Sequence, residues 1–294
     1  MQNVAIIVLH FGNMQETILC LASLKKLSAK TKHSIFVVDN GTKNIIKKEL
    51  QKIFPSVRVI INKKNLGFSE GNNKAIAKAL KQKFSHILLL NNDTIVKKNL
   101  LEKLLFIFNK PTVGIAGCTI VYENRKNDIW FNGGYLNRFF SFTKHKDMGK
   151  SSNILSGKIK ETDFITGAAM MVKREVFTKI GLLPKEYFLY WEDVDFCYAA
   201  QQMGFSIKIL EEPLVMHKVS ASSGIKGSNT LSPLRAYYYA KNPFIFIKKF
   251  KRPFLLGIIG QLAAALFYLK KTQNKNAFFK YLKGFIEGLK ILFT

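Results

Sequence analysis

The amino-acid sequence predicts an α/β protein with a Rossmann-like, mostly parallel central sheet flanked by helices. Short β-branched runs alternate with segments that carry apolar residues at helical spacing, from the N-terminus to about residue 120. Each intervening segment is long enough for a crossover helix, which a parallel strand pair requires. With 294 residues, of which 48% are hydrophobic, the chain has enough apolar surface for one large domain or two smaller ones.

The first 120 residues supply the alternating elements in order. The expected strands are residues 4–10, 34–39, 57–61, 86–90 and 113–120. The expected helices between them are residues 15–27, 43–53, 69–83 and 97–108. Ligands of such sheets bind outside the carboxyl ends of the strands, so the polar residues that follow each strand are the first candidates for a site.

The rhythm changes after residue 120. IWFNGGYL (129–136) fits a strand pair or a loop, and the Lys- and Ser-rich stretch 141–160 has no periodicity, which indicates a mobile surface loop. Residues 163–183 fit a strand followed by a helix that begins near Lys173. Residues 205–212 form the last clear strand.

The C-terminal quarter is both basic and apolar. Residues 221–294 contain thirteen Lys or Arg residues and one acid, Glu287. FLLGIIGQLAAALFYL (254–269) is shorter than the roughly 20 residues of a spanning helix, so it fits a helix at a membrane surface, or one packed on the protein or in a dimer interface. Residues 278–293 place Phe, Leu and Ile on one helical face and Lys on the other. We therefore expect amphipathic helices that associate with an anionic membrane surface.

Charge and cysteine content narrow the class of protein. The chain has 46 Lys and Arg against 19 Asp and Glu, and its net charge of +27 indicates nucleic acid, a membrane surface or a phosphorylated substrate as partner. Basic residues interleaved with apolar ones favour the membrane, and no nucleic-acid-binding motif accompanies them. Cys20, Cys118 and Cys197 are far apart and odd in number, so a reducing cytoplasm is expected. The start, MQNVAIIVLH, suits a buried strand better than a signal peptide.

Polar residues gather where the strands end. They are His10, Asp39, Asn91, Asn92 and Asp93, with His217 after the last strand. A carboxylate at Asp93 suits a divalent cation such as Mg²⁺ or Mn²⁺ that holds a diphosphate, and the His217 imidazole is a candidate ligand of the same metal. Taken singly, each also fits a turn aspartate or a structural histidine. Likewise, the small residues at 167–169 fit either a close approach of the backbone to a ligand or tight helix–sheet packing.

YFLYWEDVDFCYAA (187–200) gathers scarce negative charge among aromatic side chains. If it is helical, Glu192 and Asp195 share one face and Asp193 points about 100° away. Acids in a first helical turn also interact favourably with the helix dipole, which explains part of this cluster without a catalytic role. Aromatic rings such as Tyr190 and Trp191 are platforms for sugars and partly dehydrate a neighbouring carboxylate, so an acid here can act as a base toward a hydroxyl.

These motifs together resemble one family. The ordered series VAIIVLHFGN, VVDNGT, NKKNLGFSEGNNKAI, ILLLNNDT, the block at 163–204 and EPLVMHKVSASSG is similar to glycosyltransferase family 2, particularly its rhamnosyltransferase-like members. The resemblance covers residues 4 to about 224, and RAYYYAKNPFIFIKK resembles the helix that follows the catalytic domain in the same enzymes. It implies the A-type glycosyltransferase fold, a nucleotide-diphospho-sugar donor, a divalent metal (Mg or Mn), and inversion at the anomeric carbon by single displacement.

The resemblance also implies roles for individual residues. It makes Asp193 the catalytic base and places Glu192, Asp195, Trp191 and Tyr190 on the acceptor side, where the two acids orient hydroxyls or support the helix. It makes Asp93, the last acid of the Asp-x-Asp motif, and His217 the metal ligands. Asp39 would contact the base of the nucleotide, and Gly67 and Asn72 would line the nucleotide pocket. The full nucleotide-sugar side comprises His10, Asp39, Gly67, Asn72, Asn91, Asn92 and Asp93. Asn91 replaces the first acid of the motif, so the donor's phosphates must complete the metal site.

The sequence therefore predicts a catalytic domain at 1–222, with a nucleotide-sugar-binding half (1–95) and an acceptor-binding half (96–222), and a membrane-associating helical region at 223–294. The expected reaction moves a sugar, rhamnose first, from a dTDP- or UDP-sugar to a polyprenyl-linked or polysaccharide acceptor at the inner face of the cell membrane. Two other classes stay open: a basic membrane- or nucleic-acid-binding protein on a non-catalytic scaffold, and a sugar nucleotidyltransferase. The latter should carry a Gly-rich phosphate loop after the first strand, and HFGNMQET is not one.

Overall fold

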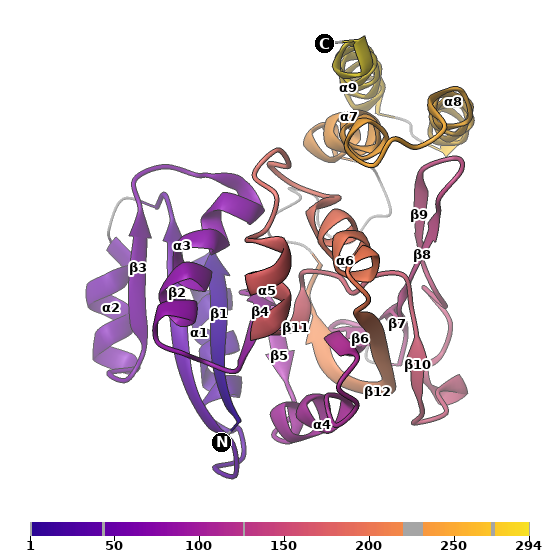
Figure 1. Ribbon diagram of the computed structural model, residues 1–294. Coiled ribbons are helices and arrows are strands. Elements are labelled where there is room, and N and C mark those ends of the chain that lie inside the picture. The colour runs from indigo at the N-terminus through magenta and orange to yellow at the C-terminus, as the bar shows by residue number, and fades with distance from the viewer. Residues whose placement is uncertain (1, 43–44, 126, 220–231, 272–273, 294) are drawn as a thin grey trace.

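One ten-stranded sheet organises the chain (Figure 1). The computed structural model describes residues 2–42, 45–125, 127–219, 232–271 and 274–293. The strands are β1 (Asn3–His10), β2 (Lys32–Asn40), β3 (Arg58–Asn62), β4 (His86–Asn91), β5 (Thr94–Val96), β6 (Val113–Tyr122), β7 (Ile129–Phe131), β8 (Gly134–Asn137), β9 (Phe142–His145), β10 (Ile159–Glu161), β11 (Ala169–Lys173) and β12 (Ser206–His217). The α-helices are α1 (Met14–Leu24), α2 (Ile45–Ile53), α3 (Gly67–Lys81), α4 (Leu100–Ile107), α5 (Arg174–Ile180), α6 (Glu192–Gln202), α7 (Pro233–Lys249), α8 (Phe254–Lys271) and α9 (Lys275–Phe293).

The main path of the sheet runs β10-β12-β6-β11-β4-β1-β2-β3. β1 pairs in parallel with β2 and β4, and β2 pairs in parallel with β3, as the alternating pattern predicts. The register places His10 beside Asp39 and Asn91 beside Leu9. The polar residues at these strand ends therefore lie along one edge of the sheet, as expected for a ligand-binding edge.

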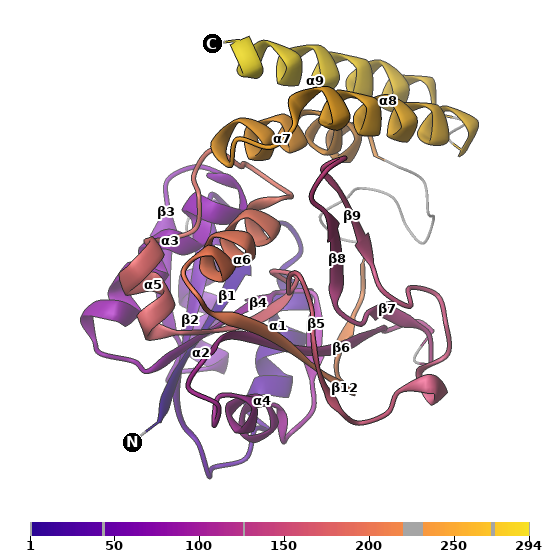
Figure 2. The ribbon, with the colours of Figure 1, turned by 45° about the vertical axis from the view of Figure 1, so that its right-hand side comes forward.

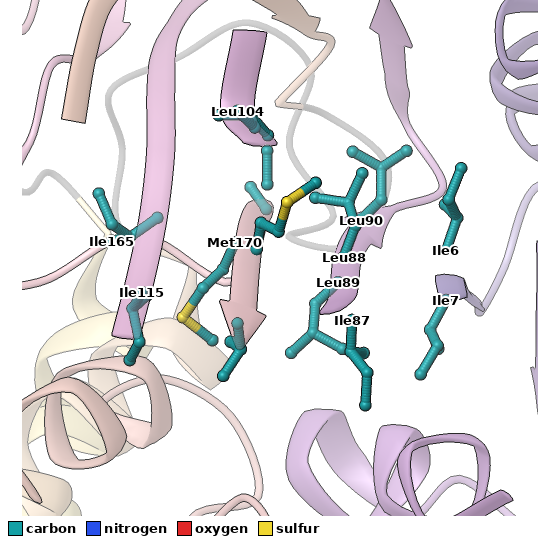
Figure 3. Close-up of a cluster of buried hydrophobic side chains, with 14 of the residues drawn as sticks. Ile6, Ile7, Ile87, Leu88, Leu89, Leu90, Leu104, Ile115, Ile165 and Met170 are labelled. Atoms are coloured by element: carbon teal, nitrogen blue, oxygen red, sulfur yellow. The ribbon is translucent and has the colours of Figure 1, made fainter. Parts of the chain in front are cut away.

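The centre of the sheet is closed on both faces by branched side chains (Figure 3). Ile6 and Ile7 of β1, Leu88 and Leu89 of β4, and Met170 of β11 are all fully buried. Consecutive buried residues point to opposite faces of a strand, so both faces are covered, which is usual for parallel sheets. Each such side chain contributes roughly 1.5–3 kcal/mol by burial, so the scaffold beneath the polar edge is rigid.

β11 runs antiparallel between β4 and β6, which places the segment 166–168 at the polar edge. Its first residue, Ala169, lies beside Leu90, next to the carboxyl end of β4. α5 begins at Arg174, close to the predicted helix start. The strand before this helix thus enters the sheet from the ligand side.

The last strand is longer than the sequence predicts. β12 continues past residue 212 to His217 and pairs in parallel with β6, and the register shifts at Pro213. Proline cannot donate a ladder hydrogen bond and is tolerated in a strand at a bulge. The bulge explains why the sequence pattern breaks at residue 212 although the strand does not end there.

Residues 129–161 differ most from the prediction. β7 pairs with β6 and β8 pairs with β9, so 129–136 holds two strands that do not pair with each other. The stretch 141–160, expected to be a mobile loop, contains β9, a short 3₁₀ turn at Ser152–Ile154, and the start of β10. The side chains of β9 are at least partly exposed on both faces, so this strand has no apolar–polar alternation from which it could be predicted.

The C-terminal helices are present as predicted, and α7 packs directly on the part of the chain that forms the large sheet (Figure 2). Phe246 of α7 is fully buried in the same hydrophobic core as the sheet. α9 lies along α7, and a side chain at Gly284 would clash with the backbone of Tyr237. Among the described residues, no helix is long and apolar enough to cross a membrane.

One predicted domain boundary falls within the described residues and the other does not. The boundary between 222 and 223 lies in 220–231, outside the described residues, as do the last residues of the EPLVMHKVSASSG motif. The division between 95 and 96 falls inside β5, which pairs with β12 from the other half. One continuous sheet therefore joins the two predicted halves.

Candidate active site

A cavity of about 150 Å³ opens at the polar edge of the sheet. It is lined by Phe68, Asn91, Asp93, Trp130, Thr143, His145, Phe164, Thr166, Gly167, Ala168, Leu189, Tyr190, Trp191, Glu192, Asp193, Val194, His217, Val219, Arg235 and Tyr239. These residues come from the ends of β4, β7, β9 and β12, from the segment before β11, and from α6 and α7. The cavity thus brings together the two acidic segments that the sequence places about a hundred residues apart.

Asp93 and His217 form a buried acid–imidazole pair on one wall. The Asp93 Oδ1 to His217 Nε2 distance is 2.9 Å, and the His217 ring packs edge-on against Trp130 at 4.4 Å between centroids. Burial alone would raise the pKa of Asp93, but the adjacent imidazole and its hydrogen bond hold it below its ordinary value. Asp93 is therefore ionised at neutral pH and available as an oxygen ligand.

The same pair fits a divalent cation. Two ligands at adjacent positions of an octahedral site, with bonds of about 2.1 Å, lie about 3 Å apart, close to the observed separation of Asp93 Oδ1 and His217 Nε2. Within the described ranges, no cluster of three or more His, Cys, Asp or Glu side chains could hold a metal by itself. The donor set thus suits a cation that takes its remaining ligands from substrate phosphates and water.

Asp193 lies on the same cavity, at the start of α6. The backbone N–H of Gly167 donates to its Oδ2 at 3.0 Å, and the N–H of Val194 donates to its Oδ1 at 2.8 Å. Burial raises the pKa of Asp193 although these donors oppose the shift. Next to it, Glu192 is buried with an unpartnered Oε2, and burial and the Asp193 charge raise its pKa well above the ordinary value. A carboxylate with a raised pKa in a shielded cavity is suited to accept a proton.

The segment before α6 is strained. Tyr190 and Trp191 both adopt left-handed backbone conformations, with φ of 69° and 75°. For residues with a Cβ atom this costs roughly 1–2 kcal/mol each, and such strain is concentrated at functional sites. The turn places Tyr190, Trp191, Glu192 and Asp193 on the cavity wall.

Asp195 does not reach the cavity. Its Oδ1 forms an ion pair with Lys249 of α7 at 2.7 Å, and its Oδ2 accepts a hydrogen bond from the Tyr187 hydroxyl at 2.9 Å. Of the two roles expected for this acid, orienting acceptor hydroxyls or supporting the helix, these contacts correspond to the second.

The remaining predicted residues line the neighbouring strand ends, outside this cavity. Asp39 is fully buried, with Oδ1 bonded to Thr42 and Oδ2 unpartnered. His10 and Asn92 both contact the Thr17 hydroxyl, at 2.6 and 3.0 Å, and burial lowers the pKa of His10. The sequence thus groups these residues correctly at one edge of the sheet.

Gly67 and Asn72 organise the start of α3. Gly67 has a φ of 76°, and a side chain there would lie 2.1 Å from the carbonyl oxygen of Phe188. Asn72 is buried and donates to the carbonyl of Phe68. Gly67 therefore allows the start of α3 to contact the loop around Phe188, which leads to Asp193. The absence of a side chain at Gly167 similarly accommodates the Phe68 ring, so this small residue serves both packing and contact with Asp193.

Thirteen of the cavity residues were not predicted as site residues, and four of these carry aromatic or charged side chains from two distant regions. Trp130 and His145 come from the strands after residue 120, and Arg235 and Tyr239 come from α7. The Arg235 guanidinium lies over the Tyr239 ring at 5.0 Å and over the Tyr190 ring at 5.8 Å. The aromatic motif RAYYY (235–239) could have indicated Arg235 and Tyr239 as site residues, whereas the sequence around His145 contains no comparable motif.

An acid–imidazole pair and a separate shielded carboxylate, facing one cavity at the carboxyl edge of an open sheet, define a glycosyltransferase of the A-type fold. The fold is similar to that of the crystal structure of GalNAc-T7 with UDP, GalNAc and Mn²⁺, with a TM-score of 0.59 and 15% identity. That alignment covers 83% of this chain and 50% of the other, so the chain spans half the length of that solved protein. The chain belongs to glycosyltransferase family 2, because the model of "Glycosyltransferase like family 2" matches residues 3–231.

Curated relatives include rhamnosyltransferases. The chain is 24% identical over 268 residues to dTDP-rhamnosyl transferase RfbF of Shigella flexneri, covering 87% of this chain and 86% of the relative. It is 23% identical over 246 residues to N-acetylglucosaminyl-diphospho-decaprenol L-rhamnosyltransferase of Mycobacterium tuberculosis, covering 77% and 78%. These findings confirm the rhamnosyltransferase-like resemblance and exclude both a non-catalytic scaffold and a nucleotidyltransferase as the class of this protein.

Proposed function

We propose that this glycosyltransferase moves rhamnose from a dTDP-linked donor to a hydroxyl of a lipid-linked glycan, with inversion and with a divalent metal, Mg²⁺ or Mn²⁺. The observation that carries the proposal is the placement of the Asp93–His217 pair and Asp193 on one cavity. An inverting transfer needs charge neutralisation at the leaving diphosphate and a base at the attacking hydroxyl. The two acidic segments supply one function each.

In this mechanism, Asp93 and His217 would hold the cation, which would supply charge neutralisation at the donor diphosphate. Asp193 accepts the proton of the acceptor hydroxyl as the oxygen attacks the anomeric carbon from the face opposite the leaving group. Tyr190 and Trp191 orient the acceptor and exclude water. The Gly167 N–H holds the Asp193 carboxylate in place throughout.

The donor assignment is supported by the activities of the relatives. The Shigella relative is described as a dTDP-rhamnosyl transferase, and the mycobacterial relative as acting on an N-acetylglucosaminyl-diphospho-decaprenol. UDP-hexoses are our second choice of donor. We assign Asp39, Gly67 and Asn72 to the part of the site that binds the nucleotide. The unpartnered Oδ2 of Asp39 is an acceptor that a base N–H can satisfy.

Attachment to an anionic membrane surface is supported by the outer faces of the last two helices. Exposed apolar side chains repeat at helical spacing on α8 (Leu255, Ile259, Leu262 and Leu266) and on α9 (Phe279, Leu282 and Ile286). On its inner face α8 is fixed to the protein, where the Gln261 amide donates to the Ser141 carbonyl at 2.8 Å. One helix thus packs on the protein and presents an apolar stripe outward, which suits an interfacial helix flanked by lysines.

Two experiments test this proposal. A panel of dTDP- and UDP-sugars is incubated with the purified protein, a prenyl-diphospho-N-acetylglucosamine acceptor, and Mg²⁺ or Mn²⁺, and release of the nucleoside diphosphate is measured. Turnover only with dTDP-rhamnose, acceptor and metal supports the assignment, and metal-independent turnover would exclude the cation from the mechanism.

Membrane attachment is tested with vesicles: Ile259→Glu should reduce cosedimentation with phosphatidylglycerol vesicles. Phe106→Glu, an equally exposed apolar site on α4, should leave cosedimentation unchanged.

A further inference from the structure

Side chains of α7 contact residues 187–195, the catalytic segment, which runs from the strained turn into α6. Figure 2 shows α7 beside α6. Tyr239 stacks on Tyr190 at 4.8 Å between ring centroids, and Phe246 packs against Trp191 at 5.4 Å. Lys249 forms an ion pair with Asp195 of α6. The contacting residues of α7 include Tyr239, Asn242, Phe246 and Lys249, whose three- and four-residue spacing places them on one helical face.

Asn242 makes the most specific of these contacts. Its side-chain amide donates to the carbonyl of Leu189 at 2.9 Å and to the carbonyl of Tyr190 at 2.7 Å. The asparagine is 1% exposed. These two carbonyls belong to the turn whose next residue, Trp191, is the second of two successive left-handed residues. A turn of this kind persists only when its surroundings hold it.

The chemistry of the contact requires an amide. Both partners are carbonyl oxygens, so only a side chain with two N–H donors at this position satisfies both. Aspartate has the same shape and no donor when ionised, and it would place negative charge against two carbonyl oxygens. Replacement of Asn242 by aspartate therefore removes the two hydrogen bonds to the turn without opening a cavity.

We propose that α7 is a positioning strap for the catalytic segment and that Asn242 is a positioning residue for Asp193. By fixing the Leu189 and Tyr190 carbonyls, Asn242 sets the path of the chain into the first turn of α6, where the Asp193 carboxylate meets the acceptor. The inference rests on the proposed role of Asp193 as the base. It concerns α7, which lies beyond the segment matched by the family model.

The test compares Asn242→Asp with Lys248→Ala, an exposed position on the same helix. We expect the aspartate variant to lose about 10- to 100-fold in kcat, with an unchanged stoichiometry of UDP or dTDP binding in the presence of Mn²⁺. The control should match the wild type in both. An unchanged kcat in a folded Asn242→Asp protein would overturn the inference. So would a loss of kcat that parallels a loss of nucleotide-binding molecules, since that is the effect of misfolding.

A second pair of variants covers the case in which Asn242→Asp does not fold. Lys249→Met removes the ion pair with Asp195 and Lys248→Met does not. Only the first should lower kcat at full nucleotide binding, and equal kcat values for the two would refute the strap.

Amide hydrogen exchange separates this inference from the proposed function. Peptides spanning 187–196 should exchange faster in Asn242→Asp or Lys249→Met than in the Lys248 controls, whether or not any sugar is transferred. If the wild type transfers no sugar, the proposed function fails while the exchange data still decide whether α7 holds the turn. Unchanged exchange at 187–196 in both strap variants would overturn the inference.

Discussion

Replacing Asp193 by asparagine removes the proposed base and little else. The amide keeps the shape of the side chain and can still accept one of the two backbone hydrogen bonds, from Gly167 or Val194. General-base catalysis contributes roughly 10²–10⁴-fold, which corresponds to about 3–5 kcal/mol of transition-state stabilisation. We therefore expect Asp193→Asn to lose that factor in kcat while it retains affinity for the donor and metal.

Stability separates this loss from unfolding. Burial raises the pKa of Asp193, so its contribution to stability is full below the ordinary aspartate pKa and is lost as the pH rises through the raised pKa. At pH values above the ordinary aspartate pKa, burial of Asp193 therefore disfavours the folded state, and the uncharged variant should melt no lower than the wild type.

The assay measures release of nucleoside diphosphate with acceptor, alongside calorimetric titration of the donor nucleotide and a melting curve. Asp128→Asn is the matched control, because Asp128 pairs with Arg125 at the surface and does not line the cavity. Transfer by Asp193→Asn within about threefold of the wild type, with normal donor binding, would refute the assignment of the base.

Three further results are expected. Asp93→Ala should abolish the Mn²⁺ dependence of donor binding in calorimetry, and a variant whose donor affinity still rises with metal would exclude Asp93 as a ligand. Because the Asp193 pKa is raised, kcat/KM should fall on the acid side at a pH above the ordinary aspartate value of about 3.9; an acid limb at or below that value would contradict a buried base. Gly67→Ala should lower the melting temperature far more than Gly149→Ala, since both glycines have positive φ but only the first faces a backbone oxygen at 2.1 Å. Equal melting temperatures would show that α3 can move away from the loop.

The part of the fold that repeats a simple pattern was predictable. β1 and β4 are runs of buried residues between helices, and burial on both faces leaves a clear signal in the sequence. β9 and the end of β12 were not predictable, for different reasons. β9 has no buried face, and β12 contains Pro213, which argues locally against a strand although the bulge accommodates it.

The candidate site divides in the same way. The alternating pattern places Asp93 at the end of a strand, whereas the role of Asp193 is implied by the resemblance of its motif to the family. The support of Asp193 by Gly167 and the contact of Asn242 with the turn depend on how distant segments pack, which no local pattern encodes. The sequence could assign Asp195 either of two roles, and only its contact with Lys249 distinguished them.

The packing of α7 means that the segment matched by the family model and the folded unit end at different residues. The family model ends at residue 231, yet the hydrophobic core continues to Phe246 and Phe250 of the following helix and its end. A chain shortened to residue 231 would expose this core and leave the strained turn unsupported. Chimeras that exchange C-terminal helices between relatives should therefore be joined after residue 250, because an exchange at residue 231 would replace α7, which lines the candidate site.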